Sequence, residues 1–121
     1  MNDISRIADK MVLGTVQFGS DYGITNVYGK PVKKEVFQIL IHAYKKGVWK
    51  FDTAPGYGSE SLLGEFFLTN GLQNKVKALT KLPSLNGLFD KGMIAKNIES
   101  SLKNLGCPIE VLFFHDPIDS T

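Results

Sequence analysis

Four short apolar runs alternate with three segments of helical periodicity along the chain. The runs are MVLGTVQF at 11–18, VWKFD at 48–52, VKALTK at 76–81 and IEVLFFH at 109–115. They are rich in Val, Leu, Ile and Phe and do not alternate cleanly, as expected of strands covered on both faces. Units of this size predict a parallel sheet whose strands are joined by right-handed helical crossovers.

The segments between the runs each place apolar side chains on one helical stripe. The stripes comprise Val36, Leu40 and Ala43 near 33–46, Leu62, Leu63, Phe66 and Phe67 after Ser59, and Ile94, Ile98, Leu102 and Leu105 near 91–105. Ser59 is the expected N-cap of the second helix, and Gly106 with Pro108 is expected to end the third. The predicted order is therefore β-α-β-α-β-α-β.

Charge, cysteine content and hydropathy exclude several classes of protein. The formal net charge is only +2 and the lysines are scattered, which argues against nucleic-acid binding. Cys107 is the single cysteine, so no internal disulfide can form and a reducing compartment is expected. The opening residues MNDISRIADK lack the apolar core of a secretion signal, and no run reaches the roughly 20 apolar residues of a membrane span. We therefore expect a cytoplasmic protein without membrane or nucleic-acid partners.

Polar side chains stand at the ends of three of the four predicted strands. These are Asp52, Lys81 and His115, and Tyr57 follows in the loop after the second strand. Parallel α/β sheets and barrels gather their active sites at the carboxyl ends of their strands. We therefore expect the four side chains to share one pocket, with Lys81 as the ionic partner of Asp52.

This combination of side chains suits proton donation by a tyrosine. A free phenol has a pKa of about 10 and releases its proton reluctantly at neutral pH. A nearby ammonium such as Lys81 would stabilise the phenolate of Tyr57, and Asp52 would hold that ammonium in place. His115 could orient a substrate carbonyl by a hydrogen bond. Protonation completes a carbonyl reduction only if a hydride arrives as well, so a nicotinamide cofactor is expected.

The stretches that contain these residues resemble a known family. DTAPGYGSESLLGEF resembles the Asp-Thr-Ala-x-x-Tyr-Gly signature of the aldo-keto reductases, LTKLP their third-strand lysine and LFFHDP their fourth-strand histidine. The likeness runs from about Met11 to Pro117. It implies an eight-stranded α/β barrel of the TIM type, NADPH as cofactor and reduction of an aldehyde or ketone. It also implies Tyr57 as the general acid.

The first strand adds a cofactor prediction to this resemblance. LGTVQFG at 13–19 is similar to the family's first strand, whose end lies near the nicotinamide. By that resemblance Gly14, Thr15 and Val16, together with Asp52, are expected to contact the cofactor. The combination LGTVQFGSDYGITN…GKP is most similar to bacterial members associated with surface-polysaccharide synthesis, which suggests a sugar-derived carbonyl substrate.

Each of the four site residues also has a structural interpretation. Asp52 could cap the turn before the second helix, and Tyr57 could be a packing residue. Lys81 could be a solvated lysine at a strand end, and His115 a hydrogen-bonded structural histidine. All four would have to be structural at once for the catalytic hypothesis to fail, and their order at successive strand ends favours catalysis.

Other candidate features have structural explanations. GYGSES at 56–61 partly mimics a dinucleotide-binding glycine motif, but Ser61 stands where the third glycine belongs. His42 lies mid-helix and is expected to be structural or solvated, while Cys107, Trp49 and the phenylalanines are expected to pack in the core. The spacing of His and Cys does not suggest a metal site.

The length of the chain suggests half of a barrel. A complete (β/α)8 barrel needs eight strand-helix units and typically about 250 residues. We therefore expect residues 1–121 to form the N-terminal half, without a second domain. The resemblance to the aldo-keto reductases implies that the cofactor's phosphates are bound by the other half. The first and fourth strands would then be open edges, which favours self-association. The alternative hypothesis is a truncated, inactive remnant that acts only through partner association.

Overall fold

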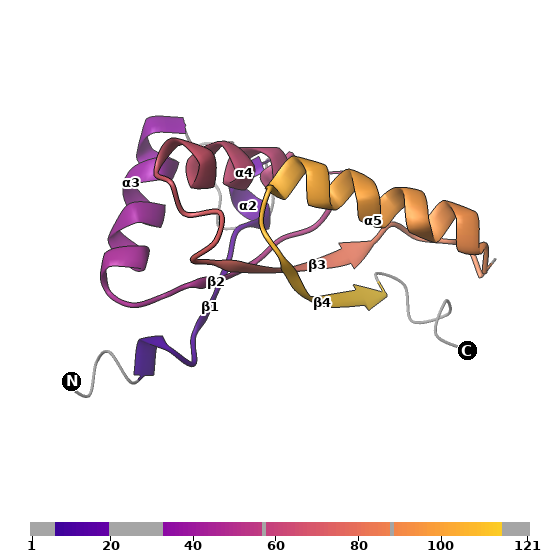
Figure 1. The fold of residues 1–121 in the computed structure, drawn as a ribbon, viewed down its shortest axis with the longest axis horizontal. Helices are drawn as coiled ribbons and strands as arrows, with labels where there is room; N and C mark the ends of the chain where they lie inside the picture. The colour runs from indigo at the N-terminus through magenta and orange to yellow at the C-terminus, as the bar shows by residue number, and fades with distance from the viewer. Residues whose placement is uncertain (1–6, 20–32, 57, 88, 115–121) are drawn as a thin grey trace.

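The structure, a computed structural model, describes residues 7–19, 33–56, 58–87 and 89–114. Strands and helices alternate along these residues (Figure 1). The elements are β1 (Val12–Gly14), α2 (Val16–Gly19), α3 (Lys33–Lys45), β2 (Lys50–Asp52), α4 (Ser59–Thr69), β3 (Lys77–Leu82), α5 (Lys91–Leu105) and β4 (Ile109–Phe114).

All pairings in the sheet are parallel, and the strands follow the order β1-β2-β3-β4. Gly14 pairs with Asp52, Asp52 with Leu79, and Lys81 with Phe113. Strands that are neighbours in sequence are thus neighbours in the sheet, joined through helices. This arrangement confirms the predicted partial (β/α) barrel.

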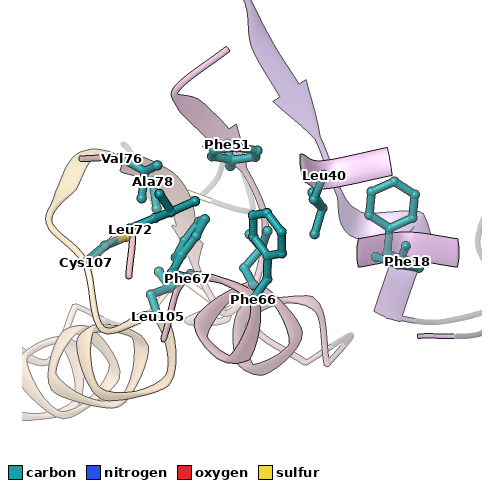
Figure 2. Close-up of a cluster of buried hydrophobic side chains, with 12 residues drawn as sticks. Phe18, Leu40, Phe51, Phe66, Phe67, Leu72, Val76, Ala78, Leu105 and Cys107 are labelled. Atoms are coloured by element: carbon teal, nitrogen blue, oxygen red, sulfur yellow. The ribbon is translucent and has the colours of Figure 1, made fainter. Parts of the chain in front are cut away.

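The helices α3, α4 and α5 lie on one side of the sheet (Figure 1). Phenylalanines from β2 and α4 fill the space between the layers (Figure 2). The rings of Phe51 and Phe67 lie 5.4 Å apart between centroids, and those of Phe66 and Phe67 lie 5.9 Å apart. Because side chains alternate along a strand, the opposite side of the sheet presents Asp52 and Lys81, and the described helices leave that side open.

The predicted helix boundaries are met at α5. Asp90 accepts hydrogen bonds from the backbone N–H groups of Gly92 and Met93, which satisfies two donors at the helix start. Gly106 adopts a left-handed conformation, with φ of 65°, and its N–H donates to the carbonyl of Leu102. Glycine takes this conformation without a steric cost, so the helix ends where the sequence predicts.

Two local predictions were wrong. The run at 11–18 is a strand only over Val12–Gly14 and then becomes the short helix α2, since an apolar run of this length also suits a buried helical turn. At α4 the N-cap position is taken by Gly58, in a left-handed conformation and without a side-chain cap. Ser59 is instead the first helical residue and is fully buried.

The core prediction was too generous for aromatic and apolar residues on uncovered surfaces. Trp49 is only partly buried, and its indole N–H donates to Asp9 Oδ1 at 2.6 Å. Phe113, Phe114 and Leu102 are between 41 and 45% exposed, and Phe89 is more exposed still. These side chains lie on β4, on the outer side of α5 and in the loop before it, where the described residues provide no covering layer.

Candidate active site

Asp52 and Lys81 meet at the carboxyl end of the sheet, as the sequence predicts. Asp52 ends β2, and Lys81 lies one residue before the end of the neighbouring strand β3. The Lys81 ammonium donates to Asp52 Oδ1 at 3.0 Å and to the carbonyl oxygen of Thr53 at 2.9 Å. Two acceptors from one neighbouring chain segment therefore fix the position of the amine.

The pair contributes little to folding. The Lys81 and Asp52 side chains are 25% and 36% exposed, so water screens their attraction. Ion pairs of this kind typically stabilise a protein by at most about 1 kcal/mol.

The pair borders an open hollow on the uncovered side of the sheet. This hollow has a volume of about 480 Å³ and is lined by Val12, Gly14, Asp52, Leu79, Lys81, Phe113 and Phe114. A second hollow, of about 280 Å³, shares Gly14 and Asp52 with the first and adds Val16 and Gln17. The space beside Gly14 is open, because a Cβ built there would meet nothing within 4 Å.

The predicted cofactor contacts do not all face these hollows. Gly14, Val16 and Asp52 line one or both of them. Thr15 is fully buried, and both its backbone N–H and its hydroxyl donate to the Asp52 carbonyl oxygen at 2.9 Å. Its side chain therefore links the end of β1 to the end of β2 by a hydrogen bond and does not line either hollow.

Tyr57 and His115 lie outside the described residues, so the structure places two of the four predicted catalytic side chains. Tyr57 follows Gly56 and precedes Gly58 in the sequence, and both glycines have positive φ values, of 89° and 78°. His115 follows Phe114, the last residue of β4. The roles assigned to Tyr57 and His115 remain predictions.

Four buried polar residues around the pair were not predicted to support the site, and only Ser59 was singled out, as a helix N-cap. They are Thr53, Ser59, Glu60 and Thr80. Each stands inside a stretch that was already singled out, within DTAPGYGSE or LTK. Their types gave no signal of burial, because Glu, Ser and Thr are usually exposed, and only the fold brings their hydrogen-bonding partners together.

Other chemistry-bearing residues show no second site. His42 is exposed, and Cys107 is buried. Burial raises the pKa of the Cys107 thiol from 9.0 to about 11, so it stays protonated and unreactive at neutral pH. Among the described residues there is no cluster of His, Cys, Asp and Glu that could bind a metal ion.

A further hollow, of about 430 Å³, lies between the N-terminal residues, β1 and α3. Its exposed lining is almost entirely apolar, although His42 and Lys46 border it. In the part of the chain that the structure describes, no helix has the length and apolar character needed to span a membrane.

Four parallel strands in sequential order, with α3, α4 and α5 on one side of the sheet, form the arrangement of part of a (β/α) barrel. The sequence profile of the Aldo/keto reductase family matches residues 10–121, and the chain belongs to this family. An assigned aldo-keto reductase from Pseudomonas aeruginosa shares 31% sequence identity, with a TM-score of 0.68, over 88% of this chain and 42% of its own.

A second structure, also of an assigned aldo-keto reductase from Pseudomonas aeruginosa, shares 29% identity with a TM-score of 0.66. It matches over 88% of this chain and 40% of its own length. The chain thus spans about two fifths of both structures. A search of the curated proteins gave no match.

Proposed function

We propose that this chain supplies the N-terminal half of an aldo-keto reductase barrel and contains its catalytic side chains. The complete protein would be an oxidoreductase that reduces an aldehyde or ketone, such as a sugar-derived carbonyl compound, with NADPH. The observation that supports this most directly is the Lys81–Asp52 pair, held at 3.0 Å beside an open hollow.

In this proposal Tyr57 protonates the carbonyl oxygen of the substrate. Lys81 favours release of the phenolic proton by stabilising the phenolate, since a positive charge nearby favours the ionised form. Asp52 and the Thr53 carbonyl hold the amine at the rim of the hollow. His115 orients the carbonyl by donating a hydrogen bond.

The residues beside Lys81 fit the reactive end of a nicotinamide cofactor, which supplies the hydride when bound. Gly14, Val16 and Asp52 would contact it, because they line the two adjoining hollows. Gly14 leaves room for a planar ring, since no atom lies within 4 Å of the place a Cβ would take. The phosphates would be bound by the rest of the barrel.

Substitution of Tyr57 tests this function in the complete protein. Tyr57→Phe removes only the phenolic hydroxyl, and with it the proton donor, and should lower aldehyde reduction by about 10²-fold or more. Binding of NADPH, followed by quenching of protein fluorescence, should stay within about twofold, because the side chain keeps its size. Tyr44→Phe is the matched control and should retain activity. Undiminished turnover by Tyr57→Phe would remove Tyr57 from this role.

A further inference from the structure

Four buried polar side chains lie behind the Lys81–Asp52 pair, on the helix side of the sheet. Thr53, Ser59, Glu60 and Thr80 are each at most 3% exposed, and none of them lines the hollow. A buried polar group lowers stability unless it is hydrogen-bonded. In this group one side-chain bond joins the end of β2 to the start of α4, and the other joins the start of α4 to β3.

The first link joins the two ends of the β2–α4 loop. Thr53 follows Asp52 directly, and its hydroxyl shares a short hydrogen bond with the hydroxyl of Ser59. The Thr53 N–H donates to the Leu79 carbonyl at 2.8 Å, while its own carbonyl accepts from Lys81. Thr53 therefore ties the loop to β3 and contacts the catalytic amine at the same time.

The second link joins the start of α4 to the end of β3. Glu60 Oε2 accepts a hydrogen bond from the Thr80 hydroxyl at 2.7 Å, in a fully enclosed setting. The first turn of a helix favours a carboxylate because the backbone dipole is positive there. Thr80 immediately precedes Lys81, so this bond restrains the backbone from which the Lys81 side chain extends.

We infer that Glu60 is a positioning residue for Lys81. Its carboxylate, through Thr80, fixes the end of β3 against α4, and the Thr53–Ser59 bond fixes the end of β2 against the same helix turn. The amine is thereby held where it reaches both Asp52 and the Thr53 carbonyl. We call these two side-chain hydrogen bonds, Thr80–Glu60 and Thr53–Ser59, the clamp. The effect of the clamp on catalysis rests on the proposed function, whereas its effect on the position of Lys81 does not.

The Thr80→Val variant tests the clamp, since valine keeps the shape of threonine and removes the hydroxyl. Two readouts are taken without cofactor or turnover: amide hydrogen exchange over residues 53–60, and acetylation of Lys81 by acetic anhydride, followed by mass spectrometry. Loss of a hydrogen bond to a carboxylate should raise both rates about tenfold to a hundredfold. Glu60→Gln keeps an acceptor oxygen and should give a smaller rise than Glu60→Ala.

Ser101→Ala is the matched control, because it removes another buried hydroxyl, on α5. It should leave both rates within about twofold of the parent. Unchanged rates in a folded Thr80→Val variant would overturn the inference, as would an equal rise of exchange throughout α3, which indicates general loosening. If Thr80→Val raises both rates as expected but the complete parent protein does not reduce carbonyl compounds, the inference about Glu60 stands and only the proposed function is contradicted.

Discussion

Gly64 lies where α4 meets the last turn of α5, so replacing it tests the packing that supports the site. A Cβ at Gly64 would lie 1.8 Å from the carbonyl oxygen of Asn104, whereas Cβ atoms essentially never come closer than 3.0 Å to such an atom. The two helices would therefore have to separate by more than an ångström in Gly64→Ala. The obstacle is backbone, so no side-chain rotation relieves it.

The expected loss of stability follows from two opposing effects. Overpacking of a close contact costs about 1–3 kcal/mol, occasionally more. Alanine favours a helix over glycine by about 1 kcal/mol, which offsets part of that cost. Because the obstacle is backbone, we take the cost at the upper end, about 3 kcal/mol, from which about 1 kcal/mol is subtracted. We therefore expect Gly64→Ala to lower the free energy of unfolding by about 2 kcal/mol, which corresponds to a fall in Tm of about 8 °C for a domain of this size.

Urea unfolding followed by far-UV circular dichroism measures this change, with Gly92→Ala as the matched control. The control makes the same substitution in a helix, but its Cβ would meet only Asp90 Oδ1, at 3.4 Å. It should be as stable as the parent or slightly more stable. If Gly64→Ala matches the control, the close approach of α4 and α5 is wrong.

Three further predictions concern charge, pH and association. Asp52→Asn should change the free energy of unfolding by less than about 1 kcal/mol, because the ion pair is partly exposed, yet it should clearly lower carbonyl reduction by the complete protein; an intact rate would contradict the catalytic interpretation. The pKa of the Cys107 thiol is about 11 in the folded protein, against 9.0 for an unburied thiol. The unfolded state therefore loses this proton first, and the free energy of unfolding should fall as pH rises from about 9 to about 11. In Cys107→Ser the free energy of unfolding should fall less over the same pH range. Because Val12, Val111 and Phe113 are exposed on the uncovered side of the sheet, the 121-residue chain alone should self-associate in sedimentation experiments; a stable monomer would argue against this.

The order of the strands and of the three longer helices, and the Asp52–Lys81 pair, could be predicted from the sequence, whereas the short helix α2 could not. Both depend on local patterns: apolar runs and helical stripes give the strands and helices, and parallel pairing then brings successive strand ends together. Lys81 needs no exact geometry to reach Asp52, since its long side chain spans the offset between the two residues in the register.

The supporting details could not be predicted, because they depend on contacts between distant segments. Glu60 can be buried because its carboxylate accepts a hydrogen bond from Thr80, twenty residues away. Thr15 can be buried because its hydroxyl donates to the Asp52 carbonyl oxygen. The sequence around Gly64 does not show why a glycine is needed there, because the reason is the close contact with the backbone of α5. Trp49 was expected in the core, but it is partly exposed and contacts the polar side chains of Asp9, Lys50 and Lys77, which are distant or charged neighbours that an apolar pattern does not predict.

Titration of the Tyr57 phenol tests the central claim most directly, namely that Lys81 lowers the pKa of this tyrosine so that it can act as the general acid. The ultraviolet difference between the complete protein and its Tyr57→Phe variant isolates the ionisation of this phenol. The account predicts ionisation well below the usual pKa of about 10, restored towards that value by Lys81→Met. A phenol that ionises near pH 10 with or without the Lys81 amine would contradict it.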